Sequence, residues 1–416
     1  MMKKKLIGPF KQILSLTDLP LKGSLTDSAL NIITESGILV EGETITAIGN
    51  FAQLRDQQSS DVEILQLAGH WICTPGYVDC HTHIAFGGNR ANDFALRNAG
   101  ASYLDIAEAG GGIWSTVRHT RQATEDELVD AIINRVQALL AQGITTIEVK
   151  SGYGLSVAEE LKMLRAIKTA QQHVAVDLIP TCLAAHMKPK DYNGDAASYL
   201  QEIATQLFPI LRTEKLSNRI DAFVEQSAFS AAEIKPYFET ARSMGFDITV
   251  HADQFSTSGS AVAVEYQAVS ADHLEASTEQ EIALLAASDT VAVALPGASL
   301  GLGCGYTPAR RLLDKGASLA IATDWNPGSA PMGQLMTQAA VLAAAEKLTN
   351  AEVFAALTFR AAKALNLTDR GRLAVGELAD FSLYRTDNYQ NIPYLQGSLQ
   401  PEQVWKKGKQ IFTKGA

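Results

Sequence analysis

The sequence predicts an α/β fold: a (β/α)8 TIM barrel with a small β-sandwich-like domain formed by both chain ends. The chain has 416 residues, which leaves room for a barrel of roughly 250 residues and an accessory domain. Its middle alternates apolar, strand-like runs with helical stretches, whereas both ends carry short apolar runs separated by turn residues. We expect the barrel to span residues 71–368 and the small domain to combine residues 1–70 and 369–416.

The two ends of the chain have a similar β-rich character. Strand candidates near the N-terminus lie at residues 30–33, 37–40 and 45–48, and the segment from about Gly371 to Ala416 contains comparable runs. Because chain termini often lie close together, we expect both ends to pair into one domain.

Eight strand candidates lie between these ends. Their apolar character is almost continuous, which is typical of parallel strands covered on both faces. They are residues 76–80, 144–149, 175–181, 220–225, 247–250, 268–271, 290–294 and 318–322. Helices separate many of them, and two helices begin with the capping patterns Thr124-x-x-Glu127 and Ser156-x-x-Glu159. This alternation favours a closed barrel, with a doubly wound sheet as the alternative.

Charge and cysteine content restrict the partners. The formal net charge of -10 argues against nucleic acid, because phosphate binding needs Lys and Arg concentrated on one face. No stretch approaches the ~18 apolar residues of a membrane span, and no cleavage site follows the lysine-rich start. The cysteines have no Cys-x-x-Cys spacing and are expected to be buried thiols in a reducing compartment: Cys73, Cys80, Cys182 and Cys304. We expect a cytoplasmic protein without nucleic-acid or membrane partners.

Polar side chains follow several of the predicted strands. In a barrel the carboxyl ends of the strands converge on one face, which holds the active site. A lone His-x-His is weak evidence, but polar groups at the ends of several apolar strands are costly to bury without partners. The candidates are His81 and His83 after the first strand, His186 after the third, His251 after the fifth, His273 after the sixth and Asp324 after the eighth.

A subset of these residues suits a divalent metal. His81 and His83 are two residues apart and share one face of a strand. His251 would add a third nitrogen and Asp324 a carboxylate, which leaves one position open for water, as catalytic metal sites require. The other histidines, His70, His119 and His173, lie away from strand ends and are expected to be structural or exposed.

These motifs resemble a known family. The segment Pro75-Gly-Tyr-Val-Asp-Cys-His-Thr-His83 is similar to the amidohydrolase superfamily of metal-dependent hydrolases, and so is Gly376-Glu-Leu-Ala-Asp-Phe381. Five further segments narrow the resemblance to the imidazolonepropionase family: His83-Ile-Ala-Phe-Gly-Gly-Asn-Arg90, Gly110-Gly-Gly-Ile113, Glu148-Val-Lys-Ser-Gly-Tyr-Gly154, His251-Ala-Asp-Gln254 and Ala322-Thr-Asp-Trp-Asn-Pro-Gly-Ser329.

The resemblance implies a histidine-degrading enzyme that opens the ring of 4-imidazolone-5-propanoate with water to give N-formimidoyl-L-glutamate. It also implies one Zn²⁺ per subunit, with Fe³⁺ as the alternative, and a homodimer. The family's metal ligands correspond to His81, His83, His251 and Asp324. Its substrate contacts correspond to Arg90, Tyr153, His186, Gln254, Asn326, Gly328 and Ser329.

The chemistry of these residues suits a small anionic lactam. Arg90 offers a guanidinium for the propanoate in an otherwise acidic chain, and Tyr153 lies between two glycines that permit close approach to a ligand. As a mechanism, we expect metal-activated water to attack the ring carbonyl while Asp324 carries its proton to the departing nitrogen. The metal and His273 would stabilise the oxyanion.

Two departures from related enzymes shape the prediction. Gln254 stands where related ring deaminases carry a glutamate, and an amide cannot donate as a carboxylic acid does, so we assign it a hydrogen bond to the substrate. No lysine follows the fourth strand, as it does in two-metal relatives, so a single metal is expected. Lys150, after the second strand, is either a pocket cation or a buried structural charge. A ring deaminase, a metal-free scaffold protein and a structural zinc site remain the alternatives.

Overall fold

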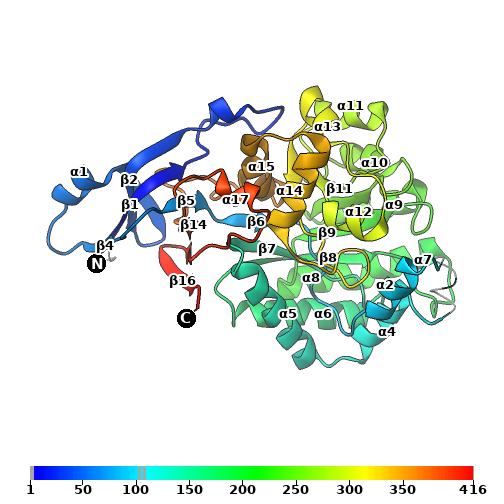
Figure 1. Cartoon of the computed structure of the whole chain (residues 1–416). Coiled ribbons are helices and arrows are strands. Elements are labelled where there is room, and N and C mark those ends of the chain that lie inside the picture. Colours follow the sequence, from blue (N-terminus) through cyan, green and yellow to red (C-terminus); the bar gives the residue numbers. More distant parts are fainter. Residues whose placement is uncertain (1–3, 102–104, 106–108, 416) are drawn as a thin grey trace.

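The barrel is the larger part of the structure. A computed structural model of the chain (Figure 1) describes residues 4–101, 105 and 109–415, so the first three residues of the lysine-rich start lie outside it. Eight parallel strands form one sheet in chain order. A parallel bridge between Thr82 and Trp325 joins the two outer ends of this sheet, so the barrel nearly closes. The strands are β6 (Tyr77–Asp79), β7 (Ile144–Lys150), β8 (Asp177–Ala185), β9 (Arg219–Val224), β10 (Asp247–Ala252), β11 (Ser270–His273), β12 (Val291–Ala294) and β13 (Leu319–Ile321). The predicted barrel is confirmed, and the doubly wound alternative is wrong.

Helices surround the barrel sheet (Figure 1). They are α2 (Ala91–Asn98), α4 (Ile113–Gln122), α5 (Glu125–Leu140), α6 (Val157–Gln171), α7 (Ala196–Glu202), α8 (Phe208–Glu214), α9 (Ala231–Ser243), α10 (Gly259–Glu265), α11 (Glu279–Ala287), α12 (Pro296–Leu302), α13 (Ala309–Lys315), α14 (Leu335–Glu346), α15 (Asn350–Leu357) and α16 (Phe359–Ala364), with a π-helical turn at Ile203–Leu207.

Both capping patterns mark real helix starts. The Thr124 side chain accepts the N–H of Glu127 and the Glu127 side chain accepts the N–H of Thr124, which completes a capping box for α5. Ser156 accepts the N–H of Glu159 at the start of α6. The apolar face of α5 is buried at Leu128, Val129, Ile132, Val136, Leu139 and Leu140.

The chain ends form a second, separate sheet of eight strands. The path runs β16-β15-β14-β5-β1-β2-β3, and β4 also pairs with β1. The N–H of Ile45 in β3 donates to the carbonyl oxygen of Glu377, and the N–H of Gly376 donates to that of Ile45. The segment before β14 therefore lies against β3, the other end of the sheet. The strands are β1 (Lys4–Leu14), β2 (Ile32–Glu41), β3 (Thr44–Asn50), β4 (Glu63–Gln66), β5 (Ile72–Pro75), β14 (Phe381–Tyr384), β15 (Gln403–Lys406) and β16 (Lys409–Thr413), with α1 (Phe51–Asp56), α17 (Asn391–Tyr394) and a 3-10 turn at Asp27–Ala29.

Several sequence expectations need correction. The candidates at 30–33 and 37–40 belong to one strand, β2, because the polar residues between them stay paired with β1 through Thr34 and Ser36. The pattern also missed β1, the strand that pairs with β2, β4 and β5. Cys304 is exposed rather than buried, since it lies in the loop after α12. The domain boundaries at 70/71 and 368/369 stay predictions; β5 at residues 72–75 pairs within the second sheet.

Ion pairs join the two sheets away from the carboxyl ends of the barrel strands. Asp177, at the start of β8, accepts from Arg370 at 2.5 Å, from Lys406 at 2.8 Å and from Lys407 at 3.1 Å. Burial alone would raise the pKa of Asp177, but Lys406 and Arg370 outweigh it and lower that pKa to about 2.

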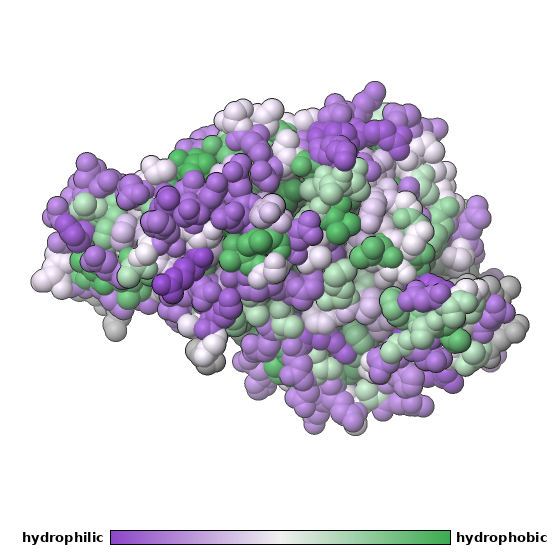
Figure 2. Space-filling model, in the orientation of Figure 1, coloured by the Kyte–Doolittle hydropathy of each residue, from purple (hydrophilic) through white to green (hydrophobic). Residues whose placement is uncertain are grey.

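The surface of the molecule is mixed. Figure 2 shows hydrophilic side chains over much of the visible face, with smaller apolar areas between them. Within the described residues, every helix is too short or too polar to cross a bilayer.

Candidate active site

The end of β6 positions the first two predicted ligands. Beyond this strand the chain continues as His81-Thr82-His83, whose main chain bonds to the segment that follows β13. The N–H of Asp324 donates to the carbonyl oxygen of His81 at 3.0 Å, and the N–H of His83 donates to that of Trp325 at 3.0 Å. This pairing places Asp324 beside both histidines.

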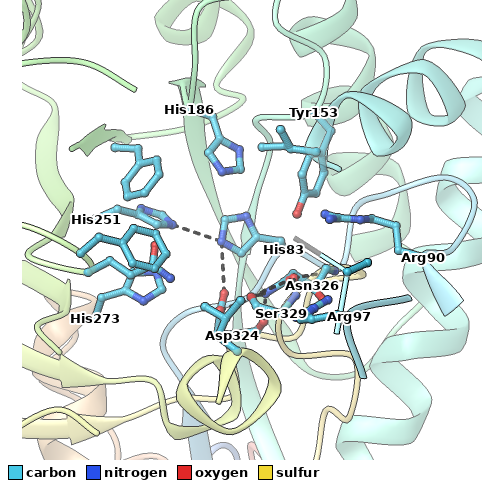
Figure 3. A pocket seen from close by; sticks show the side chains of 17 residues that line it. His83, Arg90, Arg97, Tyr153, His186, His251, His273, Asp324, Asn326 and Ser329 are labelled. Atoms are coloured by element: carbon cyan, nitrogen blue, oxygen red, sulfur yellow. Dashed lines mark hydrogen bonds and ion pairs between the residues drawn. The ribbon is translucent and has the colours of Figure 1, made fainter. Parts of the chain in front are cut away.

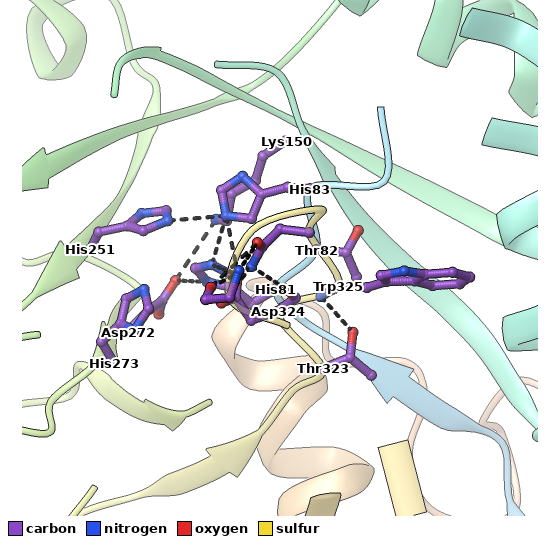
Figure 4. A network of polar contacts seen from close by, with 12 residues as sticks. His81, Thr82, His83, Lys150, His251, Asp272, His273, Thr323, Asp324 and Trp325 are labelled. Carbon is purple, nitrogen blue, oxygen red and sulfur yellow. Dashed lines mark hydrogen bonds and ion pairs between the residues drawn. The ribbon is translucent and has the colours of Figure 1, made fainter. Parts of the chain in front are cut away.

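The predicted ligand atoms converge inside the barrel (Figure 4). The Nε2 atom of His83 lies 3.2 Å from Nε2 of His81 and 3.2 Å from Nε2 of His251. Oδ1 of Asp324 lies 3.5 Å from Nε2 of His81 and 3.4 Å from Nε2 of His83. All four side chains are buried. The structure therefore brings the predicted metal ligands together, and the three histidines are close enough to share one ion.

Two carboxylates set the orientation of this cluster. Nδ1 of His81 lies 2.7 Å from Oδ2 of Asp272, and Nδ1 of His251 lies 3.0 Å from Oδ2 of Asp221. The contact of His81 is a hydrogen bond, whereas that of His251 is a close approach without hydrogen-bond geometry. Because a carboxylate accepts, both contacts favour hydrogen on Nδ1 and a lone pair on Nε2. Burial lowers the pKa of His81 well below its ordinary value and that of His251 to about 3, so both rings are neutral.

The positions of the ring hydrogens show whether these side chains suit a metal. His83 faces two Nε2 lone pairs at 3.2 Å and has at most one N–H on its own Nε2 to offer them. At least one contact is therefore repulsive unless a cation lies between the rings. Three neutral imidazoles and one carboxylate fit a divalent metal with an open position.

The turn after β13 holds Asp324 in an unusual conformation. Its φ is 49°, a left-handed region that non-glycine residues seldom occupy. Asp79 fixes the preceding residue by accepting from the N–H of Thr323 at 3.0 Å and from its hydroxyl at 2.6 Å. The Asn326 amide donates to Oδ2 of Asp324 at 2.9 Å. Burial raises the pKa of Asp324 to about 7.

His273 borders the cluster from the end of β11. Its φ is 85°, and Nδ1 lies 3.6 Å from Oε2 of Glu275. Its ring centroid lies 5.8 Å from that of His81 and 5.4 Å from that of His251. Burial alone would lower the pKa of His273, but Glu275 and Asp324 outweigh it and raise that pKa. The ring is thus suited to carry a proton beside Asp324.

A cavity of about 280 Å³ opens on this cluster (Figure 3). All seven predicted substrate contacts line it: Arg90, Tyr153, His186, Gln254, Asn326, Gly328 and Ser329. His83, His251, His273 and Asp324 line it as well, together with Arg97, Ala101, Ile113, Phe223, Phe255 and Leu302. All the predicted site residues except His81, which lies behind His83, therefore line one cavity.

Arg90 occupies the N-cap position of α2, and its guanidinium lies near Tyr153 (Figure 3). Its Nε donates to Asp93 at 2.7 Å, and the same carboxylate oxygen accepts from the N–H of Gly112 at 2.8 Å. The guanidinium packs against Gly328 so closely that a Cβ at that position would collide with its Nη1. Gly328 therefore makes room for Arg90.

The loop that carries Tyr153 wraps around a buried carboxylate. Glu160 accepts from the backbone N–H groups of Gly152 at 3.0 Å, Gly154 at 2.8 Å and Leu155 at 2.8 Å. Gly152 has a φ of 108°, and a Cβ there would lie 2.9 Å from the carbonyl oxygen of Leu183. Burial raises the pKa of Tyr153, so its hydroxyl stays protonated.

His186 presents its other nitrogen to the cavity. Nδ1 lies 3.0 Å from the carbonyl oxygen of Gly152, which can only accept, so Nδ1 carries the hydrogen and Nε2 is an acceptor. Burial lowers the pKa of His186 to about 4 and keeps the ring neutral. This state suits an N–H donor of a ligand better than a carboxylate.

Asn326 organises its own turn. Its Oδ1 accepts from the N–H groups of Gly328 and Ser329, each at 2.8 Å, and its amide donates to Asp324 and to the Ser329 hydroxyl. Most of its hydrogen-bonding capacity is therefore used within the turn that holds Asp324.

Known proteins of similar sequence carry the family names that the sequence motifs predict. The amidohydrolase family matches residues 107–412. The imidazolonepropionase of Acinetobacter baumannii (strain ACICU) is 39% identical over 392 residues, which cover 94% of this chain and 97% of that protein. The imidazolonepropionase of Pseudomonas putida is 41% identical over 391 residues, which cover 93% and 97%. This chain belongs to the imidazolonepropionase family.

Solved amidohydrolase-like structures share the fold of this family member. An atrazine chlorohydrolase from Arthrobacter aurescens TC1 complexed with zinc is 16% identical, with a TM-score of 0.74 and coverage of 98% of this chain and 95% of that one. An adenosine deaminase from Xanthomonas campestris with bound zinc is 18% identical, with a TM-score of 0.72 and coverage of 99% and 94%. At these identities the likeness concerns the fold alone.

The sequence prediction missed several residues that line the cavity of this imidazolonepropionase-family protein or contact its predicted metal ligands. Arg97 lines the cavity and donates to the carbonyl oxygens of Gly301 at 2.8 Å and Gly328 at 3.0 Å. It lies seven residues after Arg90, a spacing that repeats one helix face and would have found it. Asp221 and Asp272 were harder to recognise from the sequence. Asp221 lies within a predicted strand and Asp272 directly follows one, and neither belongs to a motif that predicts metal ligands.

Lys150 lies in the barrel interior, outside the set of residues that line the cavity. Its ammonium donates to Glu148 and Asp221, each at 2.8 Å. Of the two roles considered from the sequence, the buried charge is the one that the structure shows.

Proposed function

We propose that this protein is an imidazolonepropionase, which hydrolyses 4-imidazolone-5-propanoate to N-formimidoyl-L-glutamate in histidine degradation. The relatives at 39% and 41% identity over nearly the whole chain support this activity. The observation that carries it is a single cavity with a buried His/Asp donor set on one side and the guanidinium of Arg90 on the other.

The metal centre is one Zn²⁺ per chain, with Fe³⁺ as the alternative, held by His81, His83, His251 and Asp324. When bound, the ion acts as a Lewis acid and lowers the pKa of water toward ~7. Imidazole nitrogens and one carboxylate suit several first-row metals, so the donor set supports a metal of this class rather than one element.

Asp324 and His273 move and stabilise charge during hydrolysis. The reaction forms a carbon–oxygen bond at the ring carbonyl and breaks the ring carbon–nitrogen bond. Asp324 takes a proton from the attacking water and gives it to the departing nitrogen. His273 faces the negative charge that develops on the carbonyl oxygen.

The remaining side chains bind and orient the substrate. Arg90, fixed by Asp93, pairs with the propanoate carboxylate, and the Tyr153 hydroxyl donates to the same end. Nε2 of His186 accepts a ring N–H. Gln254 and the Ser329 hydroxyl contribute polar contacts around the ring, Gly328 leaves space beside it for Arg90, and Asn326 holds the turn beneath it.

The cytoplasmic location and the homodimer expected from the sequence belong to this proposal. Cell fractionation tests the first, and light scattering of the purified chain tests the second. A dimer mass of about twice the 44.6 kDa chain is the expected result.

Product analysis tests the activity itself. The purified protein, supplied with 4-imidazolone-5-propanoate, should release N-formimidoyl-L-glutamate. Guanine, cytosine and adenosine serve as matched substrates for a ring deaminase. Release of ammonia from one of these, without turnover of the imidazolone, would replace the proposal with a deaminase.

A further inference from the structure

Lys150 is the positive centre of a buried carboxylate group behind the histidine cluster. Its Nζ lies 2.8 Å from Oε1 of Glu148, 2.8 Å from Oδ2 of Asp221 and 3.8 Å from Oδ2 of Asp272. The side chains of all four residues are fully buried. These residues come from β7, β9 and β11, the alternate strands whose inward side chains share one layer of a barrel.

Two of these carboxylates are the partners of predicted metal ligands. Oδ2 of Asp221 is shared between Lys150 and Nδ1 of His251, and Oδ2 of Asp272 faces both Lys150 and Nδ1 of His81. Figure 4 shows Lys150 together with His81, His251 and Asp272 around this point. One ammonium therefore touches the partners of two histidines that come from different strands.

We propose that Lys150 is a positioning residue for the metal centre: it holds Asp221 and Asp272 in the orientation in which they accept Nδ1–H from His251 and His81. Both Nε2 lone pairs then point at the metal position. Partners of this kind affect metal binding because they fix the ring orientation and tautomer of a ligand. The inference rests on the proposed metal site and extends it to a residue that touches neither metal nor substrate.

The remaining contacts of the group explain why Lys150 carries this role. The Thr249 hydroxyl also donates to Oδ2 of Asp272, at 3.2 Å. Within the described residues, Oδ1 of Asp221 and Oδ1 of Asp272 have no hydrogen-bond partner, and Nδ1 of His251 lies 3.0 Å from Oδ2 of Asp221 without hydrogen-bond geometry. Lys150 is thus the shared cation of both carboxylates, and its loss would leave three buried acids facing one another.

The test compares zinc affinity in matched variants. Lys150→Met should weaken Zn²⁺ binding by about 10–100-fold, measured by chelator competition on folded protein. Glu148→Gln is the control, because Glu148 is equally buried and bonded to Lys150 but has no contact with His81 or His251; its zinc affinity should equal that of the parent. A changed visible spectrum of bound Co²⁺ in Lys150→Met, but not in Glu148→Gln, is the second readout.

A double variant covers the case in which Lys150→Met does not fold. Lys150→Met with Glu148→Gln removes one positive and one negative charge and should still bind zinc more weakly than the parent. At saturating zinc its KM should match that of the parent, since Lys150 is outside the cavity lining. Parent-like zinc affinity in the folded Lys150 variants would overturn this inference, whereas failure of the parent to bind zinc would overturn the metal centre itself.

Discussion

The N–H of Asp324 donates to the carbonyl oxygen of His81 at 3.0 Å, across the seam where the last barrel strand meets the first. The main chain itself thus sets one carboxylate beside two imidazoles. Asp79 and Asn326 hold the same turn through hydrogen bonds to Thr323 and to the Asp324 carboxylate. The seam therefore sets the carboxylate that we propose as the proton carrier beside the proposed metal ligands.

Replacing this carboxylate tests its role in proton transfer. Asp324→Asn should lower kcat by about 10²–10⁴-fold, because an amide cannot accept and release the proton. Asp314→Asn, at an exposed carboxylate on α13, is the control and should leave kcat unchanged. Turnover at the parental rate by an Asp324→Asn protein with a full metal complement would refute this assignment.

Arg90 should control substrate binding rather than the chemical step. A hydrogen bond to a charged group contributes about 1.5–3 kcal/mol, so Arg90→Met should raise KM by roughly 10–100-fold and change kcat less. Arg118→Met removes an exposed arginine of α4 and should behave like the parent. An unchanged KM for Arg90→Met would show that the propanoate binds elsewhere.

Gly328 should matter through the space that it leaves for Arg90. Gly328→Ala places a methyl group against Nη1 of Arg90 and should therefore raise KM in the same direction as Arg90→Met. Gly305→Ala is the matched control, because a Cβ at that position meets nothing within 4 Å. Steady-state kinetics measures the KM of both variants, and circular dichroism confirms that both are folded. A KM for Gly328→Ala equal to that of Gly305→Ala would contradict this role.

Local patterns in the sequence were sufficient for the barrel and for much of the candidate site. Buried parallel strands are mostly apolar, and the polar residues at or just beyond their carboxyl ends stand out, as His251 near the end of β10 and Asp324 after β13 do. The capping box at Thr124 is equally local.

Contacts between distant segments could not be predicted in this way. β1 mixes lysines and glutamine with apolar residues and buries consecutive residues such as Leu6 and Ile7, so it shows neither a continuous apolar run nor a regular alternation. β2 continues through polar residues that resemble a turn. The pairing of Lys150 with Asp221 and Asp272 joins three strands through side chains alone. No spacing rule relates such residues, so their partners emerge only in three dimensions.

The junction between the two sheets should make stability depend on pH. The pKa of Asp177 is lowered from 3.8 to about 2 in the folded state, so its ion pairs contribute about 2 kcal/mol when both states are ionised. As the pH falls from 3.8 toward about 2, the unfolded chain takes up the proton first and this contribution is lost.

Asp177→Asn should therefore lower the thermal unfolding midpoint at neutral pH. The difference from the parent should shrink as the pH falls toward the lowest value at which both proteins remain folded. A difference that stays constant over this range would show that Asp177 acts through packing or neutral hydrogen bonds instead.

Zinc titration of metal-free protein tests the central claim, that one ion held by His81, His83, His251 and Asp324 supports hydrolysis of the imidazolone ring. The chain is stripped with a chelator, reloaded in steps and assayed for formation of N-formimidoyl-L-glutamate. Activity should be absent after stripping and rise in proportion to zinc until one ion is bound per chain. Full activity in the stripped protein, or a rise that continues to two ions per chain, would contradict the account.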